Sequence, residues 1–251
     1  MMKRDHLYTF LLGIIFLMVW EVTVHIAQTS PLVLPAPSAV IQSLWQGLQS
    51  GYLLPHIVYT LSEVLLGLFI GAFLGFIGGV MLGESVRART LMMPYVVFSQ
   101  VLPKLALAPL FVMWFGFGIL PTVMITALIC FFPLLENTLT SMQKVDQQQL
   151  ELFRMLRAST WQTLWRLKLP AGLPTIMAGF RVAVVLAWVG AVVGEFMISS
   201  YGLGALIIAA QGSMDTPLMF AVLTIIAVLG LIFYKAAQLL ERHLLLSYSD
   251  H

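Results

Sequence analysis

Several ionisable residues lie inside strongly apolar stretches of this 251-residue sequence, among them Lys104, Glu136, Arg181 and Glu195. A charge inside a membrane is costly and usually has a function or a partner. Lys104 would attract an anion, or would neutralise Glu63 on a neighbouring helix. Glu136 and Arg181 would pair to close or brace an inner gate, or would form a purely structural ion pair. Glu195 would contact an external partner or line an outer gate, or would be a solvated carboxylate at the rim.

The sequence contains no motif for bond-breaking chemistry. It has no GxxxxGK[ST] phosphate loop, no HExxH helix and no GxSxG elbow. The single cysteine, Cys130, has no partner for a disulfide or metal site, and the five histidines are scattered without i, i+4 spacing. We therefore expect that this chain is not an enzyme and that it binds no metal, no cofactor and no nucleic acid.

The composition is that of an integral membrane protein. Hydrophobic residues make up 60% of the chain and charged residues 10%, whereas about half of a soluble protein is apolar. A membrane span needs about 20 apolar residues. Six stretches fit: Leu7–Ala27, Ile57–Leu82, Leu91–Phe115, Leu120–Met142, Gly172–Phe196 and Pro217–Leu240. We therefore expect an all-α membrane protein with six transmembrane helices, the first of them retained rather than cleaved as a signal peptide.

The basic residues predict the orientation, because lysine and arginine accumulate on the cytoplasmic side. Six spans place both termini on the same side. With a cytoplasmic amino terminus, all of the 13 Lys and Arg except Lys104 and Arg181 fall on the cytoplasmic side. These are Lys3, Arg4, Arg87, Arg89, Lys144, Arg154, Arg157, Arg166, Lys168, Lys235 and Arg242. We expect both termini in the cytoplasm.

Two spans carry unusual residues. Glycines recur at every fourth position of the second span, at Gly67, Gly71, Gly75 and Gly79. This stripe permits close approach of another backbone and predicts a tight helix contact within a bundle. The third span contains three prolines, which predict a break around residues 103–109. Broken backbone at membrane depth lines a cavity or is buried in protein, so a solute pathway is expected there.

The segment between the first two spans, Gln28–His56, is expected on the outer side of the membrane. Its prolines favour an extended start. Ser38 is positioned to cap a short helix whose apolar residues follow at helical spacing. This helix is expected to lie on the outer membrane surface.

A charged, helix-prone stretch, Val145–Pro170, interrupts the apolar sequence. Asp146 is followed by Gln149 and Ser159 by Gln162, which predicts two capping boxes. They would start helices over residues 147–157 and 160–169, the second ending before Pro170. Such a stretch can rest on lipid headgroups. It can also fill a groove of a soluble partner and pass the partner's movement into the membrane.

Several strings in this sequence resemble a known family. ELFRMLRAS (Glu151–Ser159), followed by WQTLWRLKLPAGLP and GFR, resembles the cytoplasmic EAA loop of ABC importer permeases. LPAPSAV (34–40), LPKLALAPLFVMWFGFG (102–118), FFPLLENT (131–138) and YGLG (201–204) are similar to the group that imports nitrate, taurine, alkanesulfonates and thiamine precursors. The resemblance covers nearly the whole chain. Leu152 and Phe153 stand where the family has paired alanines, and Arg157 stands where it has a loop glycine.

The resemblance implies a type I ABC importer permease in a bacterial inner membrane. It implies a terminal helix and periplasmic segment over residues 1–56, a five-helix permease core over 57–241 with a coupling loop at 145–170, and a tail over 242–251. Implied partners are a second copy of the chain, two ATP-binding cassette subunits that bind ATP and Mg, and a periplasmic or lipid-anchored solute-binding protein. The implied ATPase-coupling residues are Glu151, Phe153, Arg154, Leu156, Arg157 and Ala158.

The resemblance implies a small solute of the nitrate, sulfonate or taurine, bicarbonate or thiamine-pyrimidine class, and the sequence does not select among these. Two other classes of protein are alternatives to an importer permease. A self-sufficient secondary transporter would show inverted repeats, and we find none in the sequence. A membrane-embedded enzyme would cluster acids, bases or metal ligands at one depth, whereas the charges here are scattered.

Overall fold

The computed structural model describes residues 2–249, which form helices and no β-strand. The predicted all-α fold is confirmed. The helices are α1 (Met2–Ile26), α2 (Pro37–Gln49), α3 (Leu53–Glu84), α4 (Val86–Val101), the 3-10 helix η1 (Lys104–Leu107), α5 (Ala108–Phe115), α6 (Ile119–Gln143), α7 (Gln147–Met155), α8 (Thr160–Thr163), the π-helix η2 (Leu164–Lys168), α9 (Leu169–Ile198), α10 (Leu203–Gly212) and α11 (Thr216–Ser249).

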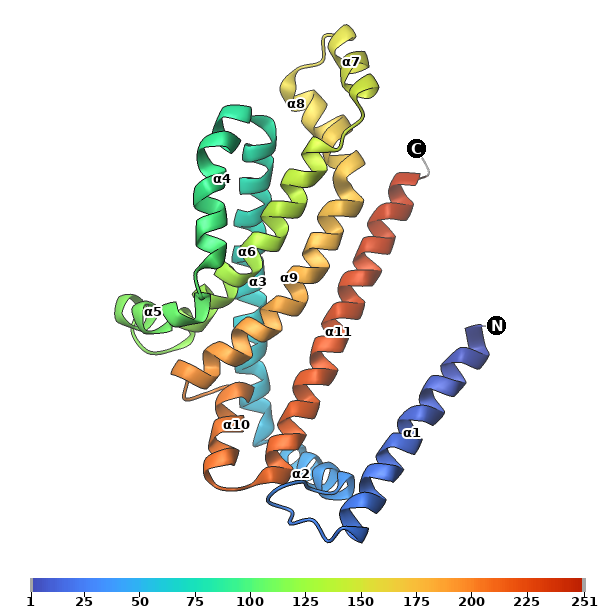
Figure 1. Cartoon of the computed structure of the whole chain (residues 1–251), viewed down its shortest axis with the longest axis vertical. Helices are drawn as coiled ribbons and strands as arrows, with labels where there is room; N and C mark the ends of the chain where they lie inside the picture. Colours follow the sequence, from blue (N-terminus) through green and yellow to red (C-terminus); the bar gives the residue numbers. More distant parts are fainter. Residues whose placement is uncertain (1, 250–251) are drawn as a thin grey trace.

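Four long helices form the core of the molecule. α6 packs between α3 and α9, and α11 packs on α9. α7 and α8 project at one end of this bundle, which we call the α7 end, and α2 and α10 lie at the opposite end, the α2 end (Figure 1). The last turns of α11 lie toward the α7 end, whereas α1 stands apart from the bundle and joins it at the α2 end (Figure 1).

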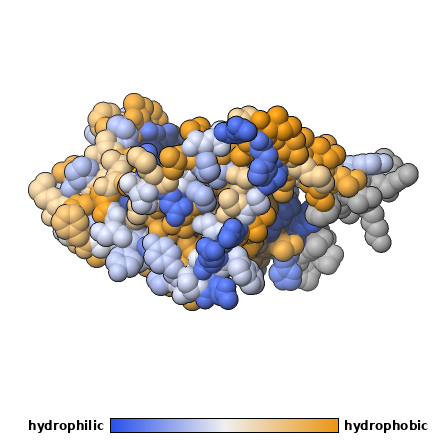
Figure 2. Space-filling model, turned by 90° about the horizontal axis from the view of Figure 1, so that it is seen from below, coloured by the Kyte–Doolittle hydropathy of each residue, from blue (hydrophilic) through white to orange (hydrophobic). Residues whose placement is uncertain are grey.

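The α2 end differs from the sides of the bundle in its surface. Seen from the α2 end, hydrophilic residues are distributed among hydrophobic ones across the face (Figure 2). The sides of α3 and α11 instead expose large apolar side chains such as Phe69, Phe73, Leu231 and Ile232. Apolar sides and a mixed α2 end suit a protein whose sides contact lipid and whose end contacts water.

The predicted count of six spans is not confirmed. In the described part of the chain, four helices are long and apolar enough to cross a membrane: Leu53–Glu84, Ile119–Gln143, Thr160–Ile198 and Thr216–Leu245. The predicted third span is a pair of helices, Val86–Val101 and Lys104–Phe115, that meet at 86°. The expected break at the prolines is confirmed. In α1 the described apolar stretch, Leu11–Ile26, is shorter than a full span.

The glycine stripe of α3 faces α6. A Cβ atom added at Gly67 would lie 2.5 Å from Cβ of Thr126, and one added at Gly79 would lie 2.5 Å from Cβ of Thr138. At Gly71 and Gly75 the nearest atoms are backbone carbonyl oxygens of α6. These distances leave no room for a side chain, so the two helices touch through their backbones.

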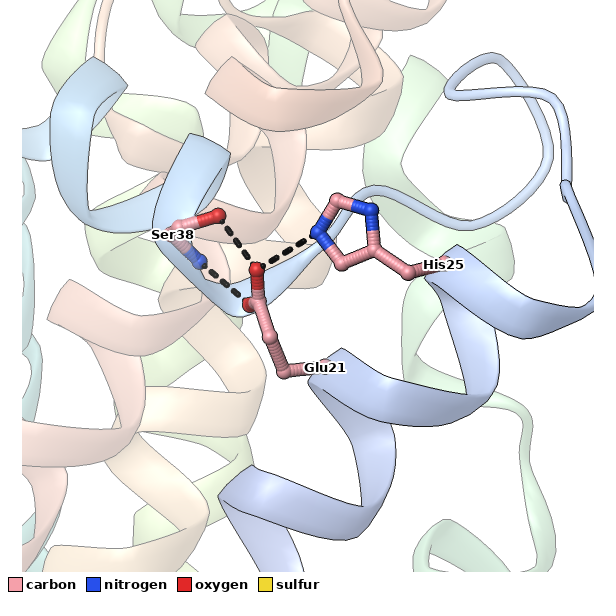
Figure 3. A network of polar contacts seen from close by, with 3 residues as sticks. All are labelled: Glu21, His25 and Ser38. Atoms are coloured by element: carbon pink, nitrogen blue, oxygen red, sulfur yellow. Dashed lines mark hydrogen bonds and ion pairs between the residues drawn. The ribbon is translucent and has the colours of Figure 1, made fainter.

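A polar network joins α1 to the start of α2 (Figure 3). The Ser38 hydroxyl and backbone N–H donate to the two Glu21 oxygens at 2.7 and 3.0 Å, and Nε2 of His25 lies 3.0 Å from Glu21 Oε1. The prediction that Ser38 caps α2 is wrong, because the helix begins at Pro37 with Ala36 as N-cap. Ser38 lies in the first turn, where a carboxylate from another helix accepts its free backbone N–H.

Candidate functional site

The predicted N-terminal cap of α7 is confirmed, whereas its capping box is not. Oδ1 of Asp146 accepts a hydrogen bond from the backbone N–H of Gln148 at 3.0 Å. Gln149 does not complete a box with Asp146. The helix ends at Met155, two residues before the predicted end. A carboxylate at the N-cap satisfies one of the free amides of the first turn, so this short helix has a defined start.

The turn after α7 is a Schellman motif centred on Arg157. Ala158 N donates to Phe153 O and Arg157 N to Arg154 O, both at 3.0 Å. This pair of bonds requires a left-handed residue after the C-cap, and Arg157 has a φ of 53°. The turn therefore requires a positive φ, which glycine adopts without strain and which Arg157 adopts despite its side chain.

Arg157→Gly should preserve this turn and stabilise it by about 1 kcal/mol, because glycine adopts positive φ without the Cβ penalty. Arg157→Val should weaken it, because a β-branched residue is strongly disfavoured there. Thermal unfolding of the purified chain measures both changes. A lower unfolding temperature for Arg157→Gly than for Arg157→Val would contradict the strain at this turn.

The surface of α7 combines exposed apolar and charged side chains. Leu152, Met155 and Leu156 are exposed by 54%, 81% and 69%. Glu151 and Arg154 are also exposed, whereas Phe153 and Ala158 are half-buried. Large apolar side chains at the tip of a projecting helix (Figure 1) are a surface that another molecule can cover.

α7 is connected by a short turn to a long continuous helix. The predicted Ser159–Gln162 capping box is confirmed by bonds of 2.8 and 3.2 Å. The predicted end before Pro170 is wrong, because the helix continues from Thr160 to Ile198. The π-helical turn Leu164–Lys168 precedes Pro170. Proline has no backbone N–H to donate, and a π-helical turn changes the pattern of backbone hydrogen bonds so that the helix can continue past it. Movement of the turn after α7 would therefore pass directly into α9.

Lys104 and Glu136 line one groove beside the break between α4 and α5. The groove has a volume of about 720 Å³, and α4, η1, α6 and α9 contribute to its walls. Nε2 of Gln100 donates to Glu136 Oε1 at 2.6 Å, and Lys104 Nζ donates to Gln100 O at 3.4 Å. The Lys104 ammonium also lies 4.7 Å from the centre of the Phe132 ring. Lys104 therefore does not neutralise Glu63, and the groove presents one cation and one carboxylate.

The predicted Glu136–Arg181 pair is not formed. Arg181 Nε lies 3.0 Å from Glu241 Oε2 on α11, and Glu136 instead accepts from Gln100. Arg181 reaches from α9 to α11, whereas Glu136 on α6 contacts α4. Sequence reasoning missed Glu241 because it lies just beyond the predicted sixth span.

Glu195 is neither exposed to a partner nor solvated at a rim, because only 1% of it is accessible. The Thr60 hydroxyl donates to its Oε1 at 2.6 Å, and the backbone N–H of Gly204 donates to its Oε2. The start of α10 thus folds over the carboxyl group. Thr60 and Glu63 were not among the predicted site residues, although a glutamate inside the apolar α3 stretch is itself a signal.

Curated relatives align along most of the chain. It is 37% identical to the riboflavin transport system permease protein RibX of Chloroflexus aurantiacus over 91% of this chain and 85% of RibX. It is 34% identical to a putative aliphatic sulfonates transport permease protein of Bacillus subtilis, SsuC, over 94% and 85% of the two chains. It is 32% identical to the formylaminopyrimidine transport permease protein ThiX of Halalkalibacterium halodurans, over 97% and 98%.

The fold has counterparts among solved structures. A chain of the MetNI methionine ABC transporter, in a structure described as inward facing, superimposes with a TM-score of 0.67 at 17% identity and covers 76% of this chain and 95% of its own length. This likeness shows that the chain shares the fold of that transporter chain. Residues 64–245 match the family described as binding-protein-dependent transport system inner membrane component. This chain, an apolar multi-pass membrane protein, belongs to that family of ABC importer permeases.

Proposed function

We propose that the chain is the membrane-spanning subunit of an ATP-driven importer and works as a homodimer with two ATP-binding cassette subunits. The observation that carries the proposal is the projecting α7, with exposed apolar side chains and a short turn into the continuous helix Thr160–Ile198. ATP and Mg bind to the cassette subunits. A solute-binding protein delivers the solute at the α2 end.

In this proposal the α7 end faces the cytoplasm of a bacterial cell. The cytoplasmic side is favoured for that end because Arg154, Arg157, Arg166 and Lys168 lie there. α11 also ends toward it (Figure 1). The opposite, mixed surface of the α2 end (Figure 2) is then available to the binding protein.

Coupling follows from the geometry of α7. Glu151, Arg154, Leu156 and Arg157 are exposed and would contact the cassette subunit, with Phe153 and Ala158 bracing the turn by their backbone bond. When the two cassettes close on ATP, α7 moves with its cassette and tilts the helix that begins at Thr160. The salt bridge of 2.7 Å between Lys168 and Glu84 ties this movement to the end of α3.

The charges that line the groove restrict the class of solute that can bind in it. Lys104 and Glu136 give it one positive and one negative group, with the Phe132 ring between helices as an apolar surface. A simple anion such as nitrate or bicarbonate would be attracted by Lys104 but repelled by the Glu136 carboxylate, which has no lysine or arginine partner among the described ion pairs. We infer that the solute is uncharged or zwitterionic, as taurine and a pyrimidine thiamine precursor are.

Lys104→Met should raise the KM for uptake by about tenfold or more, because a hydrogen bond to a charged group contributes about 1.5–3 kcal/mol. Glu136→Gln should have a similar effect for a zwitterion and a smaller one for an uncharged solute. The solute is first identified by measuring which of the candidate compounds raises the unfolding temperature of the partner binding protein. Uptake of that solute is then measured in cells. The matched control is Arg87→Met, which removes a basic side chain at an exposed position. Unchanged KM in both groove variants would remove the groove from the pathway.

A further inference from the structure

Glu63 on α3 is a buried carboxyl group that the proposed transport mechanism does not use. Its accessible fraction is 0%, and neither of its oxygens receives a hydrogen bond from the described residues. The lysine and arginine ion pairs of the described chain are Lys168 with Glu84 and Arg181 with Glu241, so no such cation compensates it. A bare carboxylate without a donor or a cation is strongly unfavourable in an apolar interior.

Two polar side chains face the Glu63 carboxyl group. The carboxyl group of Glu195 on α9 lies within hydrogen-bonding reach of it. The Thr122 hydroxyl of α6, which is also fully buried, faces Glu63 without completing a hydrogen bond. Two ionised carboxylates are both acceptors and cannot bond to each other. A contact between them therefore needs a proton.

The surroundings of Glu195 decide which residue carries this proton. Glu195 already accepts from the Thr60 hydroxyl at 2.6 Å and from the Gly204 backbone. Thr60 in turn accepts from the backbone N–H of Leu203 at 2.8 Å, which orients its hydroxyl hydrogen toward Glu195. The donors that converge on Glu195 stabilise its ionised form, whereas Glu63 faces only the Thr122 hydroxyl, which completes no hydrogen bond to it.

We propose that Glu63 binds a proton and donates it to ionised Glu195, so that one proton completes a network joining α3, α9 and α10. The network explains the glycines of the YGLG string. A Cβ added at Gly204 would lie 2.9 Å from Glu195 Cβ, and Gly202 has a φ of 111°. The proton site does not depend on which solute is carried, or on whether the cassettes drive transport.

Other titratable groups near the pair do not replace the proton. His56 Nδ1 contacts the Gly202 backbone, 3.0 Å from its carbonyl oxygen. Tyr59 of α3 lies near both carboxyl groups, and Tyr201 stacks on His56 with ring centroids 5.7 Å apart. α10 carries no titratable side chain, and α6 contributes the Thr122 hydroxyl. None of these supplies a hydrogen bond to a Glu63 oxygen.

Infrared spectroscopy of the full chain purified in detergent tests the site, because a protonated carboxyl group has a C=O stretching band that ionised carboxylates lack. We expect this band, shifted in D₂O, in the unmodified chain. Glu63→Gln should remove it, because the introduced amide donates to Glu195 in place of the carboxyl group. Glu195→Gln should retain it, and Glu84→Gln, which alters a carboxylate paired with Lys168, should leave it unchanged.

Thermal unfolding provides a second readout. Glu63→Gln should keep the unfolding temperature near that of the unmodified chain, because it replaces the donor. Glu195→Gln should lower it by several degrees, because one acceptor position becomes a donor facing the Gly204 amide or the Thr60 hydroxyl. Absence of the band in the unmodified chain, or a band lost in Glu195→Gln but kept in Glu63→Gln, would overturn the proposal. Stability that requires sodium would point instead to a bound cation and would also overturn it.

Discussion

Gly75→Leu should abolish stable assembly of the protein. A Cβ atom at this position meets the backbone carbonyl oxygen of Phe131 and lies 3.2 Å from the backbone N of Leu135. Backbone atoms of α6 cannot rotate away as a side chain can, so α3 and α6 would have to separate along the tightest contact of the bundle. We expect a loss of about 3 kcal/mol or more, at or beyond the upper end for overpacked cores.

The yield of monodisperse protein in detergent and its thermal unfolding measure this effect. Gly78 on the same helix is the matched control, because a Cβ there meets the tip of the Leu135 side chain at 3.2 Å and the edge of the Phe131 ring. Gly75→Ala should lower the unfolding temperature, whereas Gly78→Ala should leave it nearly unchanged. Equal behaviour of the two alanine variants would contradict the backbone contact between α3 and α6.

Replacing both Met155 and Leu156 by glutamate should uncouple the transporter while leaving the chain folded. Both side chains are exposed, by 81% and 69%, so the fold does not need them. Burial of each side chain under a cassette subunit would contribute about 1.5–3 kcal/mol to the free energy of binding. The glutamate that replaces it would bury an unpaired carboxylate and so oppose binding further. We expect ATP-dependent uptake to fall by about a hundredfold or more.

Co-purification with the cassette subunits and uptake in cells measure this effect together. The control is Gln143→Glu, which introduces the same charge at an exposed position at the end of α6, outside the predicted coupling loop. The unfolding temperature of the purified double variant should match that of the unmodified chain. Normal cassette binding by the double variant would show that the tip of α7 is not the docking surface.

Some local signals in the sequence predicted the local structure correctly. The proline spacing predicted the break that becomes the 86° bend between α4 and α5, and Ser159 with Gln162 predicted a capping box that forms. Such features depend on a few neighbouring residues. The family resemblance supplied the fold, and the family match over residues 64–245 bears it out.

Contacts between distant segments could not be read from the sequence. The pairing of Arg181 with Glu241 depends on how α9 is rotated against α11. The position of a single charged residue in the sequence of one helix does not define that rotation. Burial of Glu195 depends on α10, which turns back over it after residue 202. The number of spans is not confirmed for a related reason, because hydropathy counts apolar residues and not the direction in which a broken helix continues.

Arg157 occupies a turn position that normally favours glycine. It stands where the family that this sequence resembles has a loop glycine. The φ of 53° and the two Schellman bonds show that the turn forms with an arginine. In this chain the turn therefore forms with an arginine at a positive φ, at a cost in backbone strain that glycine would not have.

Reconstitution in proteoliposomes tests the central claim, that this permease imports its solute at the expense of ATP bound by partner subunits. The chain is purified with its cassette subunits and inserted into liposomes. ATP and Mg are placed on the side of the membrane where the cassettes lie, and the solute-loaded binding protein is added on the other side. We predict solute uptake that requires ATP, the cassettes and the binding protein. Uptake by the chain alone, driven by an ion gradient and unaffected by ATP, would contradict the account and identify a secondary transporter.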